Sequence, residues 1–138
     1  MTTPPNPTVW PSIRYADAPA AIRFLVDAFG FDAAFVVEGS GSRPIEHAQL
    51  HWPFGGGVML GSVDPGDRPY AKATPHTGVA ACYVVTDDAD AVHARAISGG
   101  AKIIEPMHDD PYGPEGSRSF TALDPEGNVW TFGTYRGE

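Results

Sequence analysis

The sequence contains one cysteine, few basic residues and no long hydrophobic run, and each shortage excludes a class of protein. A disulfide needs two cysteines, so Cys82 cannot form one within the chain. Its place in the apolar run Val79–Val85 predicts a buried, unreactive thiol. No apolar run approaches the roughly 20 residues that a membrane-spanning helix requires. We therefore expect no membrane among the partners of this chain.

Basic residues are scarce because acidic residues outnumber them by 17 to 9, which gives a formal net charge of −8. The Lys and Arg residues form no cluster or stripe, so we do not expect a nucleic acid as partner. An acidic surface is compatible with a cationic ligand. Residues 1–8 are rich in Pro and Thr and lack both basic residues and an apolar core. They therefore predict a flexible arm rather than a signal peptide, and a cytoplasmic protein.

Two segments carry the signals of an amphipathic helix. In the first, Asp17 suits the N-cap and Gly30 suits the residue after the last turn, with apolar residues repeating on one face between them. In the second, Asp88 is the expected N-cap and Gly99-Gly100 the stop. The two aspartates lie 71 residues apart and the two stops 70 residues apart, so the halves of the chain read as copies.

Strand signals surround both helices and complete the same order of elements in each half. We expect strands over residues 9–15, 31–38, 44–52, 58–61, 79–86, 102–105, 119–123 and 128–135. Residues 106–117 read as a polar loop, and Asp124 reads as the first residue of a type I turn. Two such modules, each with a half-buried sheet, must pair to close a core.

The sequence therefore predicts an α+β fold of two tandem βαβββ modules. After the arm at residues 1–8, we expect one domain over residues 9–138. Its modules span about residues 9–62 and 78–135, and a linker over 63–77 joins them. Whether the segment 62–77 is ordered stays open at this point.

Four stretches give the chain a family resemblance. Residues 15–31 (YADAPAAIRFLVDAFGF) resemble the first strand–helix unit of the vicinal oxygen chelate superfamily, which holds glyoxalase I, extradiol dioxygenases and bleomycin-resistance proteins. Residues 84–91 (VVTDDADA) and 99–106 (GGAKIIEP) resemble its second unit, and residues 124–130 (DPEGNVW) its terminal hairpin. The resemblance covers about residues 9–135. It implies curled mixed sheets around a shared cavity, and a homodimer in which the cavity is often completed across the interface.

Enzymes of that superfamily bind a divalent metal through His and Glu side chains on four strands. The resemblance places these positions at Trp10, at Leu60 (or Gly61 if the register shifts by one), at Ala81 and at Thr131. Of these side chains only that of Thr131 has an oxygen, and it is a weak ligand. We therefore expect neither a metal nor another cofactor, and the resemblance leans against an enzyme.

Strand parity predicts which side chains line the cavity. His47 and Gln49 alternate with the apolar Ala48 and Leu50, so they should face the cavity or solvent, while Trp130 and Phe132 should pack under the helices. The predicted ligand-binding residues are Trp10, His47, Gln49, Leu60, Tyr83, Tyr112, Arg118 and Thr131. His47 is also a weak candidate for a catalytic base. Trp52 has no assigned place.

Three functions are compatible with this pattern. The first is a metal-free protein that binds a small cationic or aromatic molecule, such as an antibiotic that it sequesters. The second is a lyase, isomerase or dioxygenase of the same superfamily. The third is a structural or regulatory module whose cavity is filled by side chains such as Trp10 and Tyr83. The sequence does not identify the ligand.

Overall fold

The computed structural model describes residues 6–137, so the expected arm at residues 1–8 lies mostly outside the described residues. The first half contains β1 (Ser12–Tyr15), α1 (Ala18–Phe24), the π-helical turn η1 (Leu25–Phe29), β2 (Asp32–Ser40), β3 (Arg43–His51) and β4 (Gly57–Ser62). The second half contains β5 (Ala81–Val85), α3 (Ala89–Ser98), β6 (Lys102–Asp110), β7 (Ser117–Leu123) and β8 (Val129–Gly133). A short helix, α2 (Pro69–Ala73), lies between them.

Each half forms its own four-stranded mixed sheet. The strand orders are β1-β4-β3-β2 and β5-β8-β7-β6, with the first two strands of each sheet parallel and the other pairs antiparallel. The predicted α+β class with two tandem βαβββ modules is therefore confirmed. The sheets do not close into a barrel.

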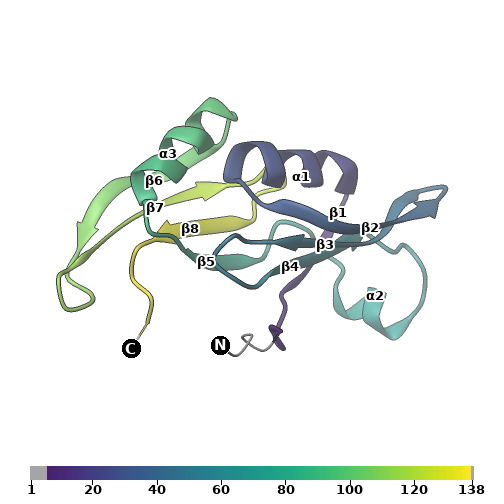
Figure 1. Cartoon of the computed structure of the whole chain (residues 1–138). Helices are drawn as coiled ribbons and strands as arrows, with labels where there is room; N and C mark the ends of the chain where they lie inside the picture. Colours follow the sequence, from purple (N-terminus) through teal and green to yellow (C-terminus); the bar gives the residue numbers. More distant parts are fainter. Residues whose placement is uncertain (1–5, 138) are drawn as a thin grey trace.

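The helices leave one side of the molecule uncovered. Figure 1 shows α1 and α3 lying on the same side of the two sheets, with α2 on the opposite side of the first sheet. We call the sheet surfaces turned away from α1 and α3 the open face. Its side chains include those of Ser12, Arg14, Gln49 and Met59 in the first sheet and Tyr83, Ser119, Thr121 and Thr131 in the second. None of the helices among residues 6–137 is long and apolar enough to cross a membrane.

The helix ends follow the sequence signals. The side chain of Asp17 accepts a hydrogen bond from Ala20 N at 3.1 Å, and that of Asp88 accepts one from Ala91 N at 3.0 Å. Gly30 ends η1 with φ at 95°, a left-handed conformation that glycine adopts without strain.

An aromatic cluster under the helices joins the two modules. Phe29 and Phe31 of the first module contact Trp130, and Phe29 also contacts Phe132, with ring centroids 4.8–5.8 Å apart. Trp130 and Phe132 are fully buried, as their strand parity predicts. Among the described residues, one continuous core therefore draws on both modules.

A buried carboxylate reinforces this junction. Asp124 begins the turn between β7 and β8, as predicted, and accepts hydrogen bonds from the Tyr15 hydroxyl at 2.6 Å and from Trp130 Nε1 at 3.1 Å. Burial, and then the charge of Asp124, raise the pKa of Tyr15, so this phenol stays protonated and donates. Glu126 in the same turn accepts from the backbone N–H groups of Ala16 and Asp17 at 2.7 and 2.8 Å. The β7–β8 turn is therefore anchored to the start of α1.

Three local expectations need correction. The first strand begins at Ser12 rather than at residue 9. The expected loop at 106–117 is shorter, because β6 continues to Asp110. β6 is an edge strand with register shifts, which is where a sheet tolerates a residue such as Pro106. The linker contains the helical turn α2.

Candidate functional site

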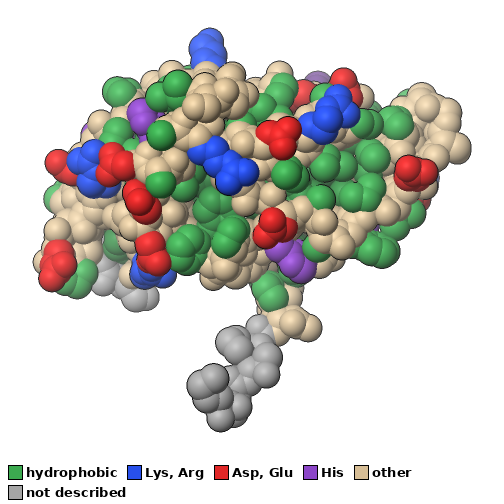
Figure 2. Space-filling view, turned by 45° about the horizontal axis from the view of Figure 1, so that its top comes forward, with side chains coloured by type: hydrophobic (Ala, Val, Ile, Leu, Met, Phe, Trp, Pro, Cys, Tyr) green, Lys and Arg blue, Asp and Glu red, His purple; other side chains and the backbone are tan. Residues whose placement is uncertain are grey.

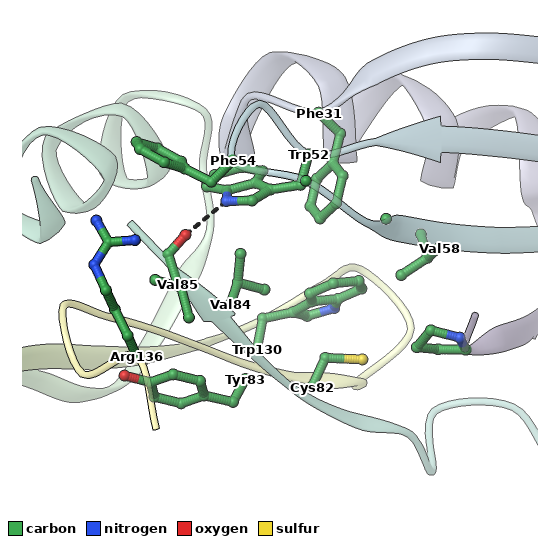
Figure 3. Close-up of a pocket in the computed structure, with 13 residues that line it drawn as sticks. Phe31, Trp52, Phe54, Val58, Cys82, Tyr83, Val84, Val85, Trp130 and Arg136 are labelled. Atoms are coloured by element: carbon green, nitrogen blue, oxygen red, sulfur yellow. Dashed lines mark hydrogen bonds between the residues drawn. The ribbon is translucent and has the colours of Figure 1, made fainter. Parts of the chain in front are cut away.

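Three neighbouring pockets lie at the open face and at the junction of the modules. The first-sheet pocket, of about 590 Å³, is lined by Asn6, Pro7, Trp10, Gln49, His51, Trp52, Gly55 and Gly56. The second-sheet pocket, of about 570 Å³, is lined by Tyr83, Ile104, Glu105, His108, Asp110, Tyr112, Ser119, Thr121, Val129, Thr131 and Tyr135. The inter-module pocket, of about 360 Å³, lies between the sheets and is drawn in Figure 3.

Trp52 and Tyr83 connect these pockets. The inter-module pocket shares Trp52 with the first-sheet pocket and Tyr83 with the second-sheet pocket. Trp52 Nε1 donates a hydrogen bond to the carbonyl oxygen of Val85 at 2.7 Å, which fixes the indole across the module boundary (Figure 3). Trp52, which the sequence left unassigned, is buried and lies just beyond the end of β3.

Cys82 also lines the inter-module pocket, where it is half-buried. Burial raises the pKa of its thiol. This lowers the fraction of reactive thiolate at neutral pH, in keeping with the unreactive thiol that the sequence predicts.

The second-sheet pocket contains a polar cluster formed by His108, Asp110 and Ser119. The Ser119 hydroxyl donates to Asp110 Oδ2 at 2.6 Å, and His108 Nε2 lies 3.1 Å from Asp110 Oδ1 and 3.3 Å from Ser119 Oγ. In a nucleophilic triad the serine proton would point at the histidine and the carboxylate at the other ring nitrogen. Here Ser119 donates to the carboxylate instead, so the arrangement is suited to binding and not to activation of the serine.

Acceptors at both ring nitrogens of His108 favour its charged form. Nδ1 lies 2.8 Å from the carbonyl oxygen of Pro106, and Nε2 faces Asp110. The hydrogen bond to Pro106, followed by the negative charges of Asp110 and Glu105, raises the pKa of His108. With Glu105 and Asp110 beside one histidine, the pocket is net acidic even when the imidazole is protonated.

Aromatic rings line the same pocket. The Tyr83 hydroxyl donates to the carbonyl oxygen of Tyr135 at 2.7 Å, and the rings of Tyr112 and Tyr135 lie 5.8 Å apart. Tyr83 and Tyr112 are 48% and 59% exposed, so their ring faces are available for stacking. Thr131 shares a 2.9 Å hydrogen bond with Thr121 on the neighbouring strand. Three members of the predicted set, Tyr83, Tyr112 and Thr131, therefore meet here.

The first-sheet pocket brings together two other predicted residues. The Trp10 ring lies 5.8 Å from that of His51, and Gln49 Nε2 lies 2.8 Å from His51 Nε2. His47 lies farther along β3 on the same face, with its ring 6.3 Å from that of Phe35. Within one chain, the predicted residues are therefore divided between two sheets.

Leu60 and Arg118 lie elsewhere. Leu60 is fully buried in the core, whereas Met59 and Gly61, the latter being the alternative position for a register shifted by one, have the parity of the open face. Arg118 contacts Asp90 of α3 at 3.0 Å and Asp109 at 2.7 Å. These partners hold its side chain toward α3 and away from the second-sheet pocket.

The open-face residues of the four strands in the two parallel pairs do not fit a divalent metal. They are Ser12 and Arg14 on β1, Met59 and Gly61 on β4, Ala81 and Tyr83 on β5, and Val129 and Thr131 on β8. This set has no carboxylate, imidazole or thiolate, the donors that such metals require. Within residues 6–137, no group of three or more His, Cys, Asp or Glu residues is placed to hold a metal ion.

Comparison with known proteins gives the fold a context. A sequence model of the Glyoxalase/Bleomycin resistance protein/Dioxygenase superfamily matches residues 8–132. A search of the curated proteins found no match. Among solved structures, TioX from Micromonospora sp. ML1 is 28% identical, with a TM-score of 0.73 and coverage of 90% of this chain and 94% of TioX.

Two solved structures from Streptomyces sp. CB03234 are also similar. TnmS3, an antibiotic binding protein, is 27% identical, with a TM-score of 0.59 and coverage of 88% of each chain. A glyoxalase/bleomycin resistance protein is likewise 27% identical, with a TM-score of 0.61 and coverage of 88% of this chain and 94% of its own.

Proposed function

Since the chain belongs to the Glyoxalase/Bleomycin resistance protein/Dioxygenase superfamily, we propose that it is a metal-free protein that binds a planar aromatic cation and thereby sequesters an antibiotic-type molecule. The observation that carries this proposal is the composition of the second-sheet pocket. Tyr83 and Tyr112 offer exposed rings for stacking, and Glu105 and Asp110 offer negative charge. Rings of this kind attract cationic aromatic ligands through stacking and cation–π contacts.

The likeness to TnmS3 supports a ligand of the antibiotic type. The net charge of −8 supports a cationic ligand, because an acidic protein attracts cations at long range. Neither observation selects one compound.

We further propose that the protein is a homodimer whose binding site is completed across the interface. The second-sheet pocket is open to solvent in one chain, whereas small-molecule sites usually bury most of the ligand surface. The first sheet exposes Phe35 and Val37 beside His47 and Gln49 on its own open face. In this arrangement the open face of the first sheet covers the second-sheet pocket of a second copy. The predicted residues of the first sheet in one copy and of the second sheet in the other then surround the same ligand.

The test is a titration of the protein with mitoxantrone, a planar anthraquinone with two cationic arms. Tryptophan fluorescence monitors the binding. We expect saturable quenching, and we expect Tyr112→Ala to raise the Kd about tenfold by removing one stacking partner. Ile97→Ala, on the exposed side of α3, is the control and should leave the Kd unchanged. Equal affinity of the wild-type protein and Tyr112→Ala would place the site elsewhere. Absence of binding to both mitoxantrone and bleomycin would contradict the ligand class.

A metal-free lyase or isomerase is the second candidate, favoured by the presence of the His108 imidazole in the same pocket. A dioxygenase requires a bound metal, which the open-face residues do not fit. Metal analysis after dialysis against Ni²⁺, Zn²⁺, Mn²⁺ and Fe²⁺ in turn tests the metal-free state that both candidates share. Stoichiometric retention of any one of them would contradict the metal-free proposal.

A further inference from the structure

The charged side chain of Arg14 has a hydrogen-bond donor for which the described part of the chain supplies no acceptor. Its Nη2 donates to the hydroxyl of Ser12 at 2.9 Å, but its Nε is buried and has no hydrogen-bond partner. An unpaired buried donor destabilises the fold unless a ligand or water satisfies it. In the described part of the chain, the ion pairs of arginine involve Arg43, Arg68, Arg118 and Arg136, and none involves Arg14.

The surroundings of Arg14 are shaped around its guanidinium group. Tyr70 of α2 places its ring 5.7 Å from the guanidinium carbon. Gly61 lies opposite Arg14 on β4, and a Cβ atom there would come within 2.5 Å of Arg14 Nη1. The ring of Tyr70 and the absence of a side chain at Gly61 thus leave room for the guanidinium group beside β4, without neutralising its charge.

A pocket lies beside this group. We call it the linker pocket; it has a volume of about 260 Å³ and is lined by Ser12, Ile13, Arg14, residues 73–80 and Asn128. It shares no lining residue with the three pockets described above. Its polar side chains include those of His76 and Thr77, and Ile13, Val79 and Ala80 are apolar. The described lining contains no Asp or Glu, although the chain as a whole is strongly acidic.

We propose that the linker pocket binds a small carboxylate with a compact apolar body. The planar guanidinium presents parallel N–H donors that match the two oxygens of a carboxylate, and such charge-assisted bonds are among the strongest hydrogen bonds in proteins. The bound carboxylate would pair with the charge of Arg14, which no acidic side chain neutralises among the described residues, and the apolar wall would take the rest of the ligand. This site is separate from the second-sheet pocket, so the inference does not rest on the proposed antibiotic-type ligand.

The test follows the Arg14 Nε–H resonance by ¹H–¹⁵N NMR of the full chain during titration with benzoate. We expect a saturable shift of this resonance, and none for Arg23 on the exposed side of α1. Arg14→Met should weaken benzoate binding at least tenfold, whereas Arg23→Met, which removes the same charge, should not. Thermal unfolding of both variants checks that they fold. Arg14→Lys, which keeps the charge but loses the planar fork, should bind benzoate more weakly than the wild-type protein.

Three results would overturn the proposal. The first is an unchanged Arg14 resonance at about 20 mM benzoate, well above a millimolar Kd. The second is benzoate binding that Arg14→Met leaves intact. The third is a shift of the Arg14 resonance with inorganic phosphate but not with benzoate, which would assign the pocket to phosphate instead of carboxylates.

Discussion

Asp124 is the residue on which the junction of the modules depends most. Its buried carboxylate accepts from Tyr15, Trp130 and both nitrogens of Asn128, and removing it would leave these donors unpaired. We expect Asp124→Ala to lower the free energy of unfolding by about 3 kcal/mol or more, since each unsatisfied buried donor costs roughly 1–3 kcal/mol. Urea denaturation measures this loss.

Asp109→Ala is the matched control, because it also replaces an aspartate by alanine. Among the described residues, the exposed Asp109 pairs with Arg118 at the surface. An exposed pair contributes roughly 0–1 kcal/mol, so this variant should remain close to wild type. Similar losses for the two variants would show that Asp124 is not a structural centre.

His108 gives a prediction about pH. Its pKa is raised, so the folded state favours the protonated ring. The resulting stabilisation is fully present below the unfolded value near 6.5 and is lost as the pH rises through the folded pKa. We expect NMR titration of the imidazole to give a pKa above 6.5, and Asp110→Asn to lower it part of the way because the Pro106 contact remains. Asp109→Asn, whose carboxylate faces Arg118, should leave the titration unchanged. A pKa at or below 6.5 in the wild-type protein would contradict the observed contacts.

At the level of elements, α3 approaches η1 closely at Gly99. A Cβ atom at Gly99 would lie 2.4 Å from the Cβ of Ala28, so Gly99→Ala must push the two helical segments apart. Overpacking of this kind typically costs about 1–3 kcal/mol. We expect a corresponding fall in the unfolding free energy, measured by urea denaturation. Ser98→Ala, one residue earlier and exposed, should stay within about 0.5 kcal/mol of wild type. If Gly99→Ala matched this control, the close contact would not limit the packing.

The helices and strands also show which features of the fold can be predicted from the sequence. The caps at Asp17 and Asp88, the order of strands and the burial of Trp130 and Phe132 follow from local signals, because capping and period-two alternation act within a few residues. The extension of β6 through Pro106 does not, since only the position of the strand at the sheet edge makes that proline tolerable. The choice between Leu60 and Gly61 on β4 stayed open for a related reason. A register shift of one residue turns every side chain of a strand to the opposite face of the sheet. The short β4 does not fix its own register.

The candidate site was less predictable than the fold. Tyr83, Tyr112 and Thr131 line one pocket, but the contribution of His108 and Asp110 depends on the continuation of β6, which the sequence pattern assigned to a loop. Arg118 has acidic neighbours on α3 and β6 that only the tertiary structure brings together. Residues that act through long-range contacts are thus the ones that local patterns miss.

At the level of the whole molecule, the helices cover one side and the pockets lie on the other. Figure 2 shows the helix-covered side in space-filling form, with charged side chains distributed among hydrophobic ones. The opposite side carries the first-sheet and second-sheet pockets, which share no lining residue within one chain. A second copy is the simplest way to bring these surfaces together, because an identical chain supplies both surfaces at once.

Two neighbouring residues on β2 test this arrangement. Phe35 pairs with Gln49 on the open face, whereas Val36 pairs with Ala48 on the helix side, and both are substantially exposed in the single chain. If the open face forms the interface, Phe35→Asp places a charge inside it and should convert the dimer to a monomer, while Val36→Asp should remain dimeric. Light scattering coupled to size-exclusion chromatography would then give about twice the chain mass of 14.6 kDa for the wild-type protein and Val36→Asp, and the single-chain mass for Phe35→Asp. A monomeric wild-type protein, or equal masses for the two variants, would remove the open face from the assembly and leave the second-sheet pocket to bind its ligand alone.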